Sequence, residues 1–174
     1  VDDQDMKLIR ATEEALNAGI KAMKVGGHVG DIGAAITKVA HRNKLQIAED
    51  LSGHGVGYSV HEEPFVPNIA KEDEGPELRE GLVIAIEPMF SLGSRDIKRL
   101  SDGYTFVTRD KSLSAHFEHT VAMTKAGAEI LSVSTDTVYV HKAWHDVSPA
   151  IKKIQFPMVA DPTGALCKEF GTYI

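Results

Sequence analysis

The sequence predicts an α+β fold in which two amphipathic helices precede an antiparallel sheet. Three observations indicate this class. Apolar residues recur at helical spacing twice before residue 44, and short apolar or alternating runs typical of strands continue to residue 133. The order of elements then changes to strand, helix and strand. We therefore expect two parts, residues 1–133 and residues 134–174.

The two helices are predicted by their apolar stripes. The first is expected over residues 5–24, where one face carries Met6, Ile9, Leu16, Ile20 and Met23. Acidic residues fill its first turn, which suits the positive end of the helix dipole, and Gly26 and Gly27 end it. The second is expected over residues 29–43, with the stripe Ile32, Ala35, Ile36, Val39 and Ala40. Each helix has one apolar face, so both should cover one sheet.

The strands of the first part are predicted from short patterned runs. Residues 82–86 form an apolar, branched run, which indicates a buried strand that ends at Glu87 and Pro88. Asp102 and Gly103 predict a tight hairpin whose second strand is 104–108. Two more strands are expected over 117–124 and 128–133, joined by a turn at 125–127.

The second part has its own order of elements. The chain from Ser134 to Trp144 is expected to run from a strand end into a helix, and Ser148-Pro149 is typical of a helix start. A short strand at 158–160, a turn at 161–164 and a short closing helix should follow.

Composition excludes several classes of function. The net charge of −6 over 174 residues argues against a nucleic-acid surface, which would need a basic patch. No apolar run approaches the roughly 20 residues of a membrane span. The single cysteine excludes an internal disulfide, and the acidic start does not resemble a signal peptide, so we expect a cytoplasmic protein without membrane or nucleic-acid partners.

Candidate chemistry gathers around residues 53–64. His54 stands between glycines, where the backbone can approach a ligand closely, and His61 follows in an extended run. Glu87 ends a buried strand and Glu118 is expected in the middle of one, where an ionised carboxylate is costly unless it is paired or binds a metal. One histidine with two carboxylates is a recurring ligand set for Zn, Mn, Fe or Co. Each carboxylate alone also fits a solvated strand edge.

Other histidines are less informative. Taken singly, His28, His41 and His116 fit surface or hydrogen-bonded residues better than ligands.

Several short motifs carry a family resemblance. They are Val29-Gly30-Asp31-Ile32-Gly33, Gly53-His54-Gly55-Val56-Gly57, His61-Glu62-Glu63-Pro64, Ile86-Glu87-Pro88-Met89, Ser112-Leu113-Ser114-Ala115 and Glu118-His119-Thr120. Through them residues 5–133 resemble the C-terminal half of a type I methionine aminopeptidase. The resemblance implies half of a pita-bread fold, a curved antiparallel sheet with two covering helices.

The same resemblance implies roles for individual residues. His54, Glu87 and Glu118 would be metal ligands, with Glu118 bridging two ions, and Glu87 would also be the general base or proton shuttle. His61 would contact the peptide and stabilise the tetrahedral intermediate, and Tyr104, where tryptophan is common, would contact substrate. The implied reaction is removal of an N-terminal methionine by metal-activated water. His116 stands where glutamine is common.

The sequence also departs from that family. Its other two metal ligands are aspartates of an N-terminal lobe, and Asp31, Asp50 and Asp96 do not match their context. We therefore expect one weakly held divalent ion (Co, Mn, Fe or Zn) in place of two, and no aminopeptidase activity on peptide N-termini from this chain alone. The uncovered half-sheet would favour self-association or docking.

The tail resembles a second family. The motifs Ser132-Val133-Ser134-Thr135-Asp136-Thr137, His141-Lys142-Ala143-Trp144-His145 and Asp161-Pro162-Thr163-Gly164 make residues 132–174 similar to the middle of a typical two-cysteine peroxiredoxin. A thioredoxin-like β-α-β fragment is implied. The peroxidatic motif is absent, so Cys167 is not expected to be peroxidatic.

Three interpretations stay open at this point. The chain is a methionine aminopeptidase homologue, a non-catalytic chimera or scaffold, or a peroxiredoxin-derived thiol protein. The join itself fits an engineered or recombined chimera, or two separate polypeptides, and intact mass would separate these.

Overall fold

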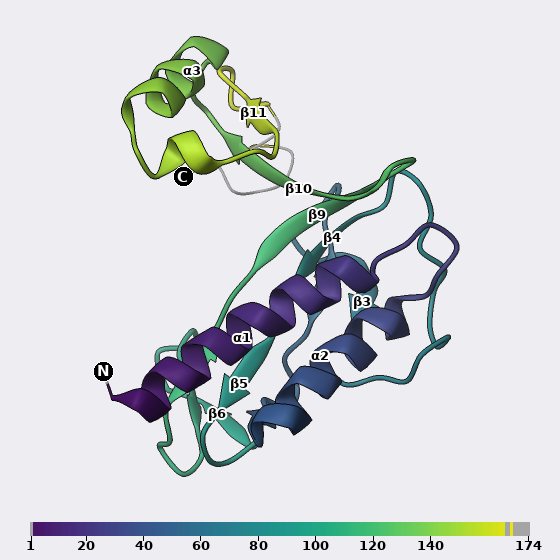
Figure 1. Cartoon of the computed structure of the whole chain (residues 1–174), viewed down its shortest axis with the longest axis vertical. Helices are drawn as coiled ribbons and strands as arrows, with labels where there is room; N and C mark the ends of the chain where they lie inside the picture. The colour runs from purple at the N-terminus through teal and green to yellow at the C-terminus, as the bar shows by residue number, and fades with distance from the viewer. Residues whose placement is uncertain (1, 166–167, 169–174) are drawn as a thin grey trace.

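The computed structural model describes residues 2–165 and 168, and two long helices open the chain. Helix α1 spans Asp3–Ala22 and helix α2 spans Val29–Asn43. The Asp2 carboxylate accepts hydrogen bonds from the Gln4 and Asp5 amides and so caps α1. The two helices lie side by side and cover one face of the sheet (Figure 1). Both helix predictions are confirmed.

The main sheet has six strands in the order β11-β10-β9-β4-β2-β3. Its strands are β2 (Gly53–Gly55), β3 (Glu62–Val66), β4 (Val83–Ile86), β9 (His119–Thr124), β10 (Gly127–Ser134) and β11 (Met158–Ala160). All neighbours are antiparallel except β10 and β11, which are parallel. The predicted α+β class is confirmed.

Two smaller sheets stand beside it. The first joins β1 (Gln46–Ile47), β5 (Met89–Ser91) and β8 (Ser114–His116) in the order β1-β5-β8. The second is the hairpin of β6 (Ile97–Arg99) and β7 (Phe106–Thr108).

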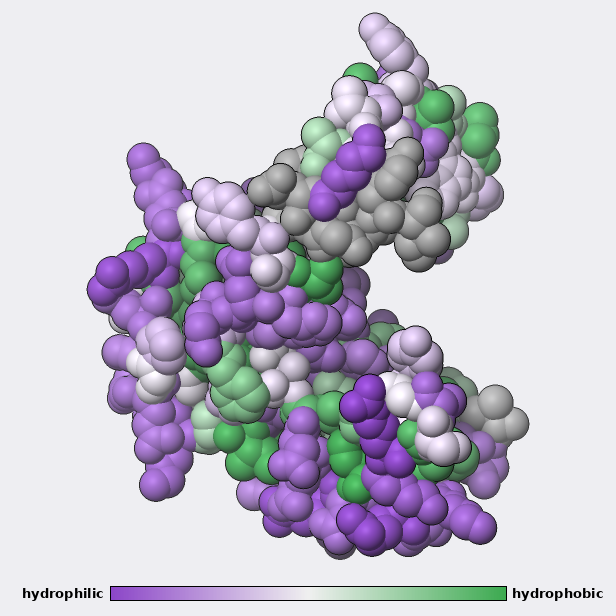
Figure 2. Space-filling view, turned by 180° about the vertical axis from the view of Figure 1, so that it is seen from behind, coloured by the Kyte–Doolittle hydropathy of each residue, from purple (hydrophilic) through white to green (hydrophobic). Residues whose placement is uncertain are grey.

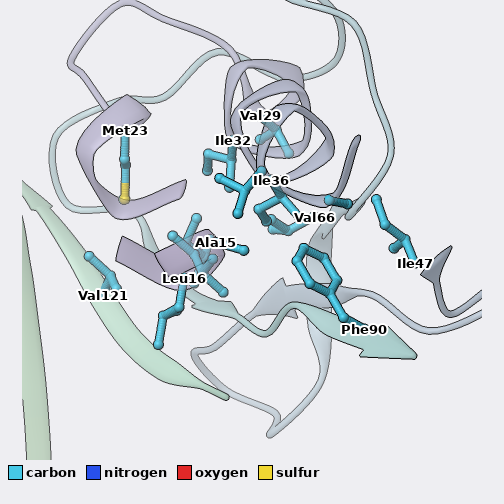
Figure 3. Close-up of a cluster of buried hydrophobic side chains, with 14 of the residues drawn as sticks. Ala15, Leu16, Met23, Val29, Ile32, Ile36, Ile47, Val66, Phe90 and Val121 are labelled. Atoms are coloured by element: carbon cyan, nitrogen blue, oxygen red, sulfur yellow. The ribbon is translucent and has the colours of Figure 1, made fainter. Parts of the chain in front are cut away.

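The hydrophobic core fills the space between the two helices and the sheets. In Figure 3, Leu16 of α1, Ile36 of α2 and Phe90 of β5 point into this space, with Val121 of β9 beside them. All four are almost completely buried. Helices α1 and α2 leave the opposite face of the main sheet uncovered, and Figure 2 views the molecule from behind relative to Figure 1. Residues on that face are therefore available for a site.

The C-terminal part continues the main sheet. Strand β10 pairs with β9 up to Leu131 and with β11 from Ser132 onwards. Helix α3 (Val138–Val147) and the short 3-10 helix η1 (Ile151–Lys153) connect β10 to β11. This is the expected strand, helix and strand order. The division of the chain near residue 133 stays a prediction, since β10 runs through that position.

The structure corrects two strand predictions. Glu118 does not lie mid-strand: β8 ends at His116, β9 begins at His119, and Glu118 occupies the break, where it is exposed. The 102–103 hairpin is wider than a two-residue turn, because Asp102 accepts hydrogen bonds from the Tyr104 and Thr105 amides and holds both in the loop. Strand β7 consequently begins at Phe106.

Three further points concern the C-terminal part. Ser148 ends α3 before η1 and its hydroxyl accepts from the Ile151 amide, so the predicted helix start is a single 3-10 turn. Most of the expected closing helix lies outside the described residues. Among the residues described, no helix has both the length and the apolar character needed to cross a membrane.

Candidate metal centre

His54 is positioned by the pairing of two strands. It lies in β2 directly opposite Ala85 of β4, and Glu87 follows the end of β4. The backbones approach unusually closely here: a Cβ on Gly53 would lie 2.2 Å from the Ala85 carbonyl oxygen. The glycines around His54 therefore permit the close packing that brings its ring to Glu87.

The tautomer of His54 makes its second nitrogen a metal donor. Its Nδ1 lies 2.8 Å from the Gly55 carbonyl oxygen, which can only accept, so Nδ1–H donates. The Nε2 faces Glu87 Oε1, 3.4 Å away, and is the ring nitrogen that can supply a lone pair to a metal. A cation shared by the two atoms would stabilise this arrangement, which is the usual one for metal-ligating histidines. His54 and Glu87 thus fit a metal by their chemistry.

Glu87 is the most enclosed carboxylate of the site. Its side chain is 13% exposed, and it has an imidazole beside each oxygen. His116 Nε2 lies 3.3 Å from Oε2, on the side away from His54. The Asn68 side-chain amide donates to the backbone carbonyl of Glu87 at 3.1 Å and fixes the chain after β4. Ligand atoms from Glu87, His116 and Glu118 all lie within 4.8 Å of one another.

The electrostatics of the cluster favour positive charge. The side-chain hydrogen bond with Glu87 raises the pKa of His116 above its ordinary value, against the opposing effect of burial. The charges of Glu87 and Glu118 act in the same direction as the hydrogen bond. Two carboxylates that stabilise an imidazolium would also stabilise a divalent cation.

The other predicted site residues lie at different distances from this cluster. His61 is brought in: its ring centroid lies 4.1 Å from that of His54. Tyr104 is not: it lies in the β6–β7 loop, is 86% exposed and does not line the groove described next. Its substrate contact stays a prediction.

A groove of about 1100 Å³ opens beside Glu87 and Glu118. His54, His61, Glu87 and Glu118 line it together with the 56–63 loop. Leu131 and Val133 of β10 and Val159 of β11 contribute apolar lining from the C-terminal side. The groove thus combines a polar end with an apolar wall.

Two residues near the site were not predicted from the sequence. His116 fitted an ordinary surface histidine, although its position two residues before Glu118 in an extended run would have placed both side chains on one face. No local sequence pattern indicates that Val159 lines the groove, because its position there depends on the parallel pairing of β11 with β10.

The fold and the site together define an α+β protein that carries a histidine–carboxylate cluster able to hold a metal ion. The model of metallopeptidase family M24 matches residues 1–125, and the chain belongs to this family. Membership implies a divalent metal cofactor. A second model, the AhpC/TSA family, matches residues 104–174.

The second match corrects the predicted ranges. It begins at residue 104 and not at 132, and it overlaps the M24 match over residues 104–125. The prediction that the chain consists of segments from two families is confirmed. The prediction of a sharp join near residue 132 is not confirmed.

Curated relatives carry the same family signal. The chain is 43% identical over 128 residues to "Methionine aminopeptidase B" of Synechocystis, covering 74% of this chain and 47% of that protein. It is 49% identical over 128 residues to the "Methionine aminopeptidase" of Aquifex aeolicus, covering 72% and 50%. The chain spans about half the length of the curated relatives that it matches.

A solved structure supports the fold. The methionine aminopeptidase of Thermotoga maritima superposes with a TM-score of 0.73 at 41% identity, covering 75% of this chain and 52% of that one. The fold is therefore half of a pita-bread fold, and a thioredoxin-like segment follows it.

Proposed function

We propose that this chain carries the metal-binding half of a methionine aminopeptidase site. One observation supports this most strongly: His54 and Glu118 lie with the enclosed Glu87 in a groove that has an apolar wall. An N-terminal methionine offers both an amino group for the carboxylates and an apolar side chain for that wall. The relatives named methionine aminopeptidase support the same substrate class.

His54, Glu87 and Glu118 are the proposed ligands for one divalent ion, which we take to be Co, Mn, Fe or Zn. Such an ion would supply Lewis acidity, lowering the pKa of water and polarising a carbonyl. His54 offers Nε2, 3.4 Å from Glu87 Oε1, and Glu87 and Glu118 offer oxygen donors within 4.8 Å of each other. Nitrogen and oxygen donors together suit any of these metals.

The remaining steps fall to the chain's own side chains. Glu87 has one oxygen facing each imidazole and would accept a proton from the attacking water, then return it to the leaving amine. His61, beside His54 at the groove, would donate a hydrogen bond to the oxygen of the scissile carbonyl. The 56–63 loop would hold the peptide backbone.

A polypeptide of these 174 residues should bind one ion weakly and should not turn over a methionyl peptide. Of the metal-type clusters within the described residues, the one that includes Glu87 contains no aspartate. A two-metal clamp needs further carboxylates on the opposite side of the ions. In type I methionine aminopeptidases, a separate N-terminal lobe supplies these carboxylates.

The test uses the 174-residue polypeptide with Co²⁺ or Mn²⁺ and a methionyl tripeptide. We expect measurable metal binding, no turnover alone, and turnover when the N-terminal half of the Thermotoga maritima enzyme is added. E87Q should abolish the restored activity. Robust turnover by the polypeptide alone would refute the claim that its catalytic site is incomplete. Absence of metal binding would refute the proposed metal site itself.

A second candidate is a non-catalytic chimera. The matches of two different family models to the two parts of the chain and the change of partner along β10 favour it. Intact mass of the natural product distinguishes one fused chain from two polypeptides. A peroxiredoxin-derived thiol protein is the third candidate, but Cys167 lies outside the described residues, and we expect no peroxidase activity.

Location and association belong to the same proposal. We place the protein in the cytoplasm, with peptide N-termini as partners, and expect self-association through the uncovered sheet face. Cell fractionation and sedimentation velocity test these two points.

A further inference from the structure

His116 reaches the metal centre from a strand outside the main sheet. It is the last residue of β8 and lies opposite Met89 of β5, two residues after Glu87. The Phe117 amide donates to the Pro88 carbonyl oxygen at 3.3 Å and ties the β8 end to the chain that carries Glu87. The imidazole is therefore held against the carboxylate by backbone pairing on both sides.

The distance between the two side chains is informative. His116 Nε2 and Glu87 Oε2 are 3.3 Å apart, longer than the roughly 2.7–2.9 Å of a charge-assisted hydrogen bond. Two ligands of one tetrahedral zinc ion, each about 2.0–2.2 Å from the metal, stand about 3.4 Å apart. The distance of 3.4 Å between His54 Nε2 and Glu87 Oε1 equals this ligand–ligand distance.

The third donor is also in reach. Glu118 follows His116 by two residues in the break between β8 and β9, and its ligand atom lies within 4.8 Å of those of Glu87 and His116. The side chain of His116 is 47% exposed, so small rotations of its ring cost little packing. The cluster can therefore contract around an ion without moving the strands.

We propose that His116 is a nitrogen ligand of the metal held by Glu87 and Glu118. This inference rests on the proposed metal centre and extends it. Three protein ligands leave one position of the tetrahedral shell of zinc open for water, as in catalytic zinc sites, whereas structural sites fill all four positions. Mn²⁺, which favours oxygen donors, gains less from the extra imidazole.

Metal selectivity follows from this ligand set. Zinc should bind more tightly than manganese. A glutamine at position 116 removes the imidazole and should leave the two carboxylates of Glu87 and Glu118 as ligands. The chain would then lose zinc affinity much more than manganese affinity.

The experiment is a chelator-competition titration of the 174-residue polypeptide with ZnCl₂ and with MnCl₂. We expect H116Q to weaken zinc binding by at least about 100-fold, since even residues that only support a ligand contribute about 10–100-fold. Manganese binding should weaken by less than about 10-fold. H41Q removes a surface imidazole from α2 and is the matched control, with both affinities unchanged.

The visible absorption of the Co²⁺-loaded polypeptide provides a second readout. Tetrahedral coordination by wild type should give an intense band, and H116Q should give a weaker one as the coordination changes. Thermal unfolding in EDTA checks that H116Q folds without metal.

The outcomes separate the two levels of the proposal. If E87Q abolishes binding of both metals while H116Q changes neither, His116 is not a ligand and the metal centre stands. Equal losses for zinc and manganese in H116Q would mean that His116 only positions Glu87, and would overturn the inference. If E87Q retains full affinity for both metals, the proposed metal centre itself is wrong.

Discussion

Replacing Gly55 by alanine tests whether close strand packing builds the metal centre. Gly55 lies in β2 between two strands, paired with Glu62 of β3 and Ile84 of β4. A Cβ there would lie 2.0 Å from the Glu63 carbonyl oxygen and 2.5 Å from its carbonyl carbon. The neighbouring atoms are backbone, so no side-chain rotation can relieve the overlap.

The size of the effect follows from this geometry. The Cβ would be about 1.4 Å short of an ordinary 3.4 Å contact, so β2 and β3 must separate by about that amount. Overpacking typically costs about 1–3 kcal/mol, and a rigid backbone neighbour places G55A near 3 kcal/mol. For a chain of this length that corresponds to a fall in Tm of about 6–12 °C.

Urea unfolding followed by circular dichroism in EDTA measures this loss. G26A is the matched control, because Gly26 has a φ of +80° but no atom within 4 Å of a Cβ. Its left-handed backbone alone should cost about 1 kcal/mol. If G55A proves as stable as G26A, the strands are not packed as closely as described and the explanation for the glycines around His54 fails.

Three further predictions follow from the described contacts. L16A, at a side chain 2% exposed in the core, should lower the free energy of unfolding by about 3 kcal/mol in the same urea assay, and a loss below about 1 kcal/mol would contradict the core packing. D31N should lose about 1 kcal/mol at pH 7, because Asp31 accepts from the His28 and Asp73 amides. The hydrogen bond from the His28 amide, followed by that from the Asp73 amide, lowers the pKa of Asp31. This stabilisation is therefore present above pH 3.8 and disappears as the pH falls through the folded-state pKa. A difference between D31N and wild type that does not change with pH would exclude the charge of Asp31 as its source. V159D should weaken binding of a fluorescent methionyl peptide about 5-fold, corresponding to about 1 kcal/mol of apolar contact, whereas V138D, an exposed residue that does not line the groove, should leave it unchanged.

Local patterns in the sequence were sufficient for the helices and for the main ligand candidates. The stripe through Ile32 and Ile36 predicts α2 with its exact bounds, because a 3.6-residue period leaves one apolar face that must be buried. Glu87 was predictable as a site residue, since a carboxylate at the end of a buried strand needs a partner. His54 was marked by its flanking glycines.

Tertiary structure decided which of these side chains meet. The break that exposes Glu118 arises because β8 pairs with β5 and β9 with β4, so the chain changes sheets between His116 and His119. That change brings His116 to Glu87, almost 30 residues away along the chain. Likewise, Val159 joins the groove only because β11 pairs in parallel with the end of β10. Residue periodicity fixes which face of an element is buried, whereas the register between distant strands fixes which side chains share a site, and that register depends on the packing of the whole chain.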